Sequence, residues 1–92
     1  MSDRIFISYG HEDEEFVLRL ARDLEGRGAQ VWIDRGDLHP GVEWQRSIAN
    51  AIANCQAFLL VVSKDSLAST YVNQEMALAE AHQKTIFPLI YE

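Results

Sequence analysis

The fold class is decided by residues 57–62, Ala57-Phe58-Leu59-Leu60-Val61-Val62, which form an unbroken apolar run. A strand with one buried face alternates apolar and polar residues, whereas a strand covered on both faces is apolar throughout. We therefore expect this run to be the central strand of a parallel sheet with a helix layer on each face.

Three further segments have the length and composition of strands. They cover residues 4–9, 30–34 and 85–90, so that together with residues 57–62 the sequence predicts four strands. Segments of helical periodicity separate them, which is the pattern of successive βαβ units. Right-handed crossovers then favour a flavodoxin-like α/β fold with strand order 2-1-3-4 and a crevice at the carboxyl ends of the first and third strands.

The helices are expected between these strands. Residues 13–25 place apolar side chains on one stripe, have acidic residues in the first turn and are followed by Gly26 and Gly28, which favour a helix end. A second helix is predicted from apolar positions between Trp44 and Cys55. A third, with an N-cap at Ser69 or Thr70, is predicted from the spacing of Val72, Met76 and Ala79.

Composition limits the function classes. The chain has 92 residues, enough for one domain, and its 48% apolar and 24% charged content is typical of a globular protein. A formal net charge of -6 argues against binding to nucleic acid, which requires clustered basic residues. Since no apolar run reaches the roughly 18 to 20 residues that cross a bilayer, we expect no membrane span.

The side chains that bind metals are scattered. His11, His39 and His82 are far apart in the sequence, and the single cysteine, Cys55, lies in an apolar stretch. We therefore predict no metal site, and we interpret Cys55 as a small core residue that suits a reducing, cytoplasmic environment.

Three motifs in order resemble those of the Toll/interleukin receptor (TIR) domain family. They are an apolar first strand that ends in Ser8-Tyr9, a Pro40-Gly41 loop after the second strand, and a Ser/Thr-rich segment from Ser66 that leads to Glu75. The resemblance covers residues 1–92 as one TIR domain. It also implies that the fifth strand and last helix of the family are missing, so we expect the chain to be C-terminally incomplete and part of a longer protein.

The resemblance implies an enzyme that cleaves NAD+ between nicotinamide and ribose. In catalytic TIR domains a glutamate at the position of Glu75 is the catalytic residue, and NAD+ is a substrate, with no cofactor. The expected substrate-binding residues are Ser8, Tyr9, Arg35 and Tyr71, although the family often has Trp where this chain has Tyr71. From the sequence alone, Glu75 was expected close to the first turn of its helix, where the helix end favours an ionised carboxylate.

One carboxylate is chemically sufficient for this reaction. Nicotinamide is cationic in NAD+ and leaves as a neutral base, so no general acid is required, in contrast to most glycosidases. An ionised glutamate can stabilise the oxocarbenium-like transition state. Attack by water then gives ADP-ribose, and attack by the adenine end gives a cyclic product.

The loop from Arg35 to Glu43 is long for a connection between a strand and a helix, and it contains Asp37, Pro40 and Gly41. In TIR domains this loop mediates association. We therefore expect other TIR domains as partners, in a homo-oligomer that activates the enzyme, with a role in immune defence. The alternative is a non-catalytic TIR adaptor that uses the loop only to recruit other TIR domains.

Two other classes with related folds are disfavoured by the residues. A dehydrogenase would need Gly-x-Gly-x-x-Gly after the first strand, which the chain lacks. A phosphoacceptor receiver domain would need an aspartate at the end of the third strand, where Val62 and Ser63 stand.

Overall fold

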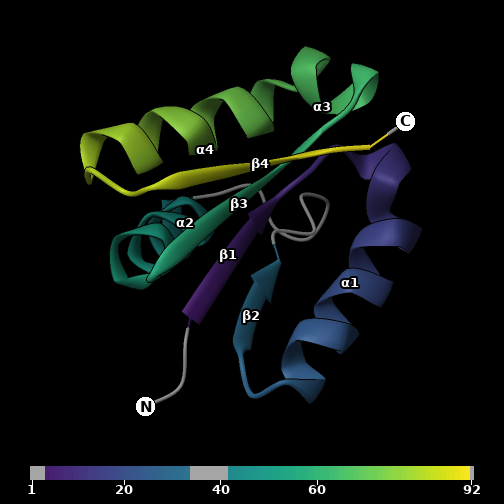
Figure 1. Ribbon diagram of the computed structural model, residues 1–92. Helices are drawn as coiled ribbons and strands as arrows, with labels where there is room; N and C mark the ends of the chain where they lie inside the picture. Colours follow the sequence, from purple (N-terminus) through teal and green to yellow (C-terminus); the bar gives the residue numbers. More distant parts are fainter. Residues whose placement is uncertain (1–3, 34–41, 92) are drawn as a thin grey trace.

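The computed structural model describes residues 4–33 and 42–91. Four strands form one parallel sheet in the order β2-β1-β3-β4 (Figure 1). This order confirms the predicted flavodoxin-like topology. The elements in chain order are β1 (Arg4–Ser8), the 3-10 turn η1 (His11–Asp13), α1 (Glu14–Gly26), β2 (Gln30–Ile33), α2 (Val42–Asn54), β3 (Ala57–Val62), α3 (Lys64–Ala68), α4 (Thr70–Ala81) and β4 (Ile86–Ile90).

The face of the sheet toward α2 and α4 carries an aromatic core. Phe6, which has no exposed surface, lies in the middle of this face. Its ring stacks on Trp32 at 4.9 Å between centroids and on Phe58 at 5.4 Å. Ile52 from α2 and Val72 from α4 belong to the same cluster. Trp32 is therefore a packing residue, as its alternation with Val31 and Ile33 predicts.

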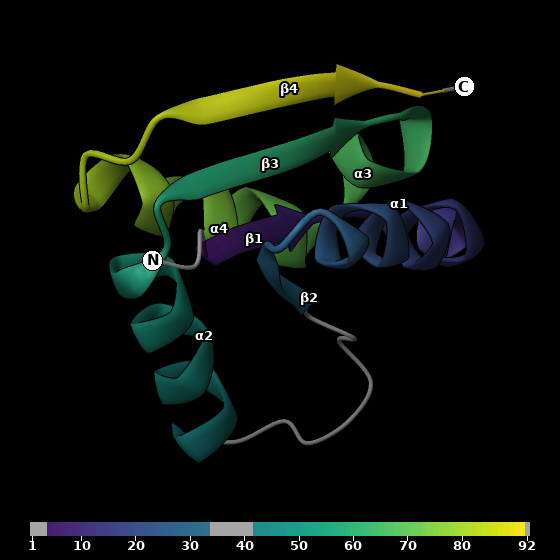
Figure 2. The same cartoon turned by 60° about the horizontal axis from the view of Figure 1, so that its bottom comes forward.

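The opposite face is covered by α1. Val17 of this helix is fully buried against Ile7 of β1 and Val61 of β3. Near the carboxyl end of the sheet, the ring of Phe16 stacks on Tyr91 at 4.1 Å. Helices thus cover both faces, which explains why β3 is apolar on both sides (Figure 2).

The predicted helix boundaries agree closely with the structure. α1 is preceded by Asp13, and the chain turns after Gly26 through Gly28, whose φ of 98° is a left-handed conformation that glycine adopts without strain. Ser69 is the N-cap of α4, as predicted. The short helix α3 was not predicted, because five residues are too few to show a helical period.

The sequence predicts no segment that crosses a membrane. Within residues 4–33 and 42–91, no helix is both long and apolar enough to cross a bilayer.

Candidate functional site at the carboxyl end of β1

Glu75 lies on the buried stripe of α4. Its neighbours on this stripe include Val72, which is 1% exposed, and Ala79, which is fully buried. Because residues three and four apart share a helix face, Glu75 points toward the sheet with them and is itself only 3% exposed. A carboxylate therefore occupies a position where the helix pattern favours an apolar residue.

The start of α4 fixes the place of Glu75 within the helix. The hydroxyl of Ser69 accepts a hydrogen bond from the backbone N–H of Val72 at 3.3 Å and so begins α4. Since Thr70 is the first helical residue, Glu75 is the sixth and belongs to the second turn. Glu75 therefore lies just beyond the first turn, in agreement with the predicted position close to it, and the charge effect of a helix end falls off over this distance.

The carboxylate of Glu75 accepts a hydrogen bond from β1. The Ser8 hydroxyl donates to Oε1 of Glu75 at 2.7 Å, within a buried environment. Ser8 is the last residue of β1 and has no exposed surface. It points to the same side as Phe6, two residues earlier, which is the α2 and α4 side. Ser8 and Glu75, two of the expected site residues, thus lie together at the carboxyl end of β1.

The loop after Ser8 is packed tightly onto α3. Gly10 is buried, and a Cβ atom at this position would lie 3.0 Å from the backbone carbon of Asp65 and 3.0 Å from the backbone nitrogen of Ser66. The lack of a side chain at Gly10 therefore allows the backbone of this loop to approach α3 closely.

A second contact joins the same two segments. The Ser63 hydroxyl donates to Oδ2 of Asp13, a buried carboxylate at the start of α1. Ser63 is also the N-cap of α3 and forms a reciprocal capping box with Ser66. This contact and the packing of Gly10 hold the carboxyl ends of β1 and β3 in a defined relation.

Of the other expected site residues, Tyr9 is the one whose side chain the structure describes. The ring of Tyr9 belongs to the cluster on the α1 side, with Ile7 and Val17, so the structure places it on the opposite face from Glu75. The side chain of Tyr71 and the loop residues Arg35, Asp37, Pro40 and Gly41 lie outside the described part of the structure, and their roles stay predictions. Among the five expected catalytic and substrate-binding residues, the described contacts bring together Ser8 and Glu75.

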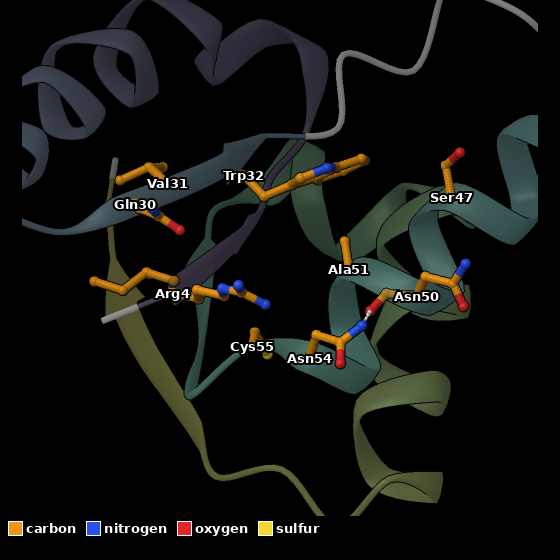
Figure 3. A pocket seen from close by; sticks show the side chains of 10 residues that line it. Arg4, Gln30, Val31, Trp32, Ser47, Asn50, Ala51, Asn54 and Cys55 are labelled. Carbon is orange, nitrogen blue, oxygen red and sulfur yellow. Dashed lines mark hydrogen bonds between the residues drawn. The ribbon is translucent and has the colours of Figure 1, made fainter. Parts of the chain in front are cut away.

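Two of the cavities lined by described residues lie at opposite ends of the sheet. One of about 510 Å³ lies beside the starts of β1 and β2, between Arg4, Gln30, Trp32 and the end of α2 at Asn54 (Figure 3). Another of about 580 Å³ lies at the carboxyl ends of β3 and β4 and includes Asp13, Ser63 and Tyr91 among its lining residues. Glu75 is not among the lining residues of these two cavities, and its side chain is 3% exposed.

The sequence predicts no metal site. Over residues 4–33 and 42–91, no three His, Cys, Asp or Glu side chains converge in a way that could hold a metal ion.

Two curated relatives share this sequence pattern. Over 73 residues, the chain is 36% identical to a protein named NAD(+) hydrolase TcpA from a Theionarchaea archaeon, with 78% of the chain and 22% of the relative covered. It is 33% identical over 73 residues to 2' cyclic ADP-D-ribose synthase AbTIR from Acinetobacter baumannii, with 78% and 27% covered. The chain thus spans about a quarter of the length of these relatives.

Solved structures share the fold. The TIR domains of the activated Roq1 resistosome, which directly recognises the pathogen effector XopQ, superpose with a TM-score of 0.80 at 26% identity, with 99% of this chain and 58% of the other covered. The family profile described as TIR domain matches residues 5–92. With that match over nearly the whole chain and the parallel 2-1-3-4 sheet, the chain belongs to the TIR domain family.

Proposed function

We propose that this domain is an NAD+ glycohydrolase in which Glu75 is the catalytic residue. The observation that carries the proposal is a carboxylate, 3% exposed, that is held by Ser8 at the carboxyl end of β1. Burying a carboxylate costs stability, and ligands of open parallel sheets bind outside the carboxyl ends of the strands. The names of the two relatives, a hydrolase of NAD(+) and a cyclic ADP-D-ribose synthase, support the same substrate.

The proposed reaction breaks the bond between C1′ of the ribose and the nicotinamide nitrogen. The electron pair of that bond moves to the nitrogen, which neutralises the pyridinium, and positive charge develops on the ribose. The Glu75 carboxylate stabilises this charge and accepts a hydrogen bond from a ribose hydroxyl. Water then forms the new bond to C1′ and releases a proton, which gives ADP-ribose; the adenine end takes the place of water if the product is cyclic.

Activation by self-association fits the enclosed position of Glu75. With 3% of its surface exposed, the side chain must become more accessible before a ribose can contact it. We place this change in the association of TIR domains, for which the resistosome neighbour offers a precedent among proteins of the same fold. The cellular role that follows from the proposal is depletion of NAD+ as the effector step of a cytoplasmic immune response.

The test is nicotinamide release from NAD+ by the full chain under conditions that promote assembly, which sedimentation monitors in parallel. We expect Glu75→Gln to abolish release, because the amide cannot supply the negative charge. The matched control is Glu80→Gln, an exposed position on the same helix, which should retain activity.

The outcomes separate the two classes of function. Equal release by wild type and Glu75→Gln would remove the catalytic role of Glu75. If assembled wild-type protein releases no nicotinamide, the alternative of a non-catalytic TIR adaptor replaces the enzyme.

A further inference from the structure

We infer that Ser8 is a positioning residue, whose hydroxyl holds the Glu75 carboxylate in its reactive orientation and does not bind the substrate. The inference rests on the proposed function, since it concerns how the catalytic group is oriented. The two residues are 67 positions apart in the chain and are joined by a buried hydrogen bond of 2.7 Å.

The backbone at Ser8 is rigid. Its Cα is in register with Leu60 of β3. The preceding residue, Ile7, is in register with Ile33 of β2 on one side and with Leu59 of β3 on the other. β1 is therefore bonded on both sides, and the loop that follows it is fixed by the packing of Gly10 on α3. A serine side chain adds only one torsion between this backbone and its hydroxyl, so the position of the donor is well defined.

The orientation of the Glu75 carboxylate depends on a contact with a fixed donor. A glutamate side chain has three torsions, and its carboxylate can occupy many positions unless a contact selects one. The hydrogen bond from Ser8 holds Oε1 and thereby restricts the orientations open to the carboxylate. Small displacements of a catalytic group reduce the rate strongly, so a fixed carboxylate should be worth a measurable part of kcat.

The geometry also argues against Ser8 as a hydrogen-bond donor to the substrate. A serine hydroxyl has one hydrogen to donate, and here Glu75 receives it. Ser8 itself has no exposed surface, whereas Glu75 retains 3%. Removal of the Ser8 hydroxyl should therefore act through Glu75, on kcat more than on KM.

The first test compares steady-state kinetics of Ser8→Ala with wild type in the assembled protein. We expect kcat to fall by about 10- to 100-fold with KM for NAD+ almost unchanged. Ser8→Thr, which keeps a hydroxyl, should recover most of the loss. The matched control is Ser66→Ala, which removes an equally buried hydroxyl whose bonds are to the backbone of Ser63, the N-cap of α3. This variant should lower Tm but leave kcat near wild type.

The second test measures thermal melting and does not depend on activity. If Ser8 and Glu75 act as a pair, the Ser8→Ala/Glu75→Ala double variant should lose less in Tm than the sum of the two single losses, because alanine at either position removes the hydrogen bond. Additive losses, or a folded Ser8→Ala variant with wild-type kcat, would overturn the inference. These results are distinguishable from failure of the proposed function, which would appear as activity in Glu75→Gln.

Discussion

Gly10→Ala is the substitution with the sharpest structural expectation. The added Cβ would lie 3.0 Å from the carbonyl carbon of Asp65, 3.0 Å from the nitrogen of Ser66 and 3.2 Å from the Cα of Ser66. Ordinary contacts of a Cβ begin near 3.4 Å. All three neighbours are backbone atoms of α3, so no flexible side chain can move aside.

The cost follows from what must shift. α3 is held by its capping box and by the bond from Ser63 to Asp13, so relief of the clash requires displacement of a braced segment. Overpacking of this kind costs about 1–3 kcal/mol. The lower entropy of alanine in the unfolded chain offsets about 0.4–1 kcal/mol. We expect a net loss of about 1–2 kcal/mol in the free energy of unfolding.

The assay is thermal unfolding followed by circular dichroism. For a domain of this size each kcal/mol corresponds to about 4–8 °C, so Tm should fall by roughly 5–15 °C. Gly26→Ala is the matched control, because Gly26 ends α1 and a Cβ there meets nothing within 4 Å. That variant should be as stable as wild type or slightly more stable. A Gly10→Ala protein that melts with wild type would refute the packing argument.

Two further predictions concern the core. Phe6→Ala should lower the free energy of unfolding by about 3–5 kcal/mol, because it removes a fully buried ring that stacks on Trp32 and Phe58. Phe87→Ala, at a position 50% exposed, is the control and should lower it far less. Urea titration measures both values. Burial raises the pKa of the Cys55 thiol above its ordinary value of 9.0, against a smaller lowering by Lys84. The stability from the neutral thiol is therefore complete below the unfolded-state pKa and lost as pH rises through the higher folded-state pKa. Melting of wild type and Cys55→Ala between pH 7 and pH 10.5 should show a steeper alkaline decline in wild type, and parallel curves would contradict this explanation.

Local patterns predicted most of the scaffold. The apolar run at residues 57–62 coincides with β3, and Ser69 caps α4 because a serine hydroxyl can satisfy a free N–H at a helix start. α3 was missed, although Ser63 and Ser66 form a capping box there. A serine at the last position of such a box is a weaker signal than glutamate or glutamine, which are the usual partners.

The candidate site was predicted in part. The TIR resemblance identified Glu75 as the catalytic residue and Ser8 as a substrate-binding residue, but it did not predict that the two side chains are joined by a hydrogen bond. The Tyr9 ring packs on the face opposite Ser8, as the alternation of side chains along the predicted strand 4–9 implies, so the two expected substrate-binding residues do not share a face. The contact between Ser8 and Glu75 joins residues 67 positions apart, and no local pattern predicts such a contact.

The sequence by itself determined the alternation of strands and helices, since apolar periodicity and capping act between residues a few positions apart. The tertiary structure decided that the carboxylate on α4 is enclosed and bonded to the last residue of β1. It also decided that the Asp13 and Ser63 side chains join the loops beside them. These contacts link residues 50 and 67 positions apart, and only the packing of α4 and α3 against the sheet brings them within hydrogen-bonding distance.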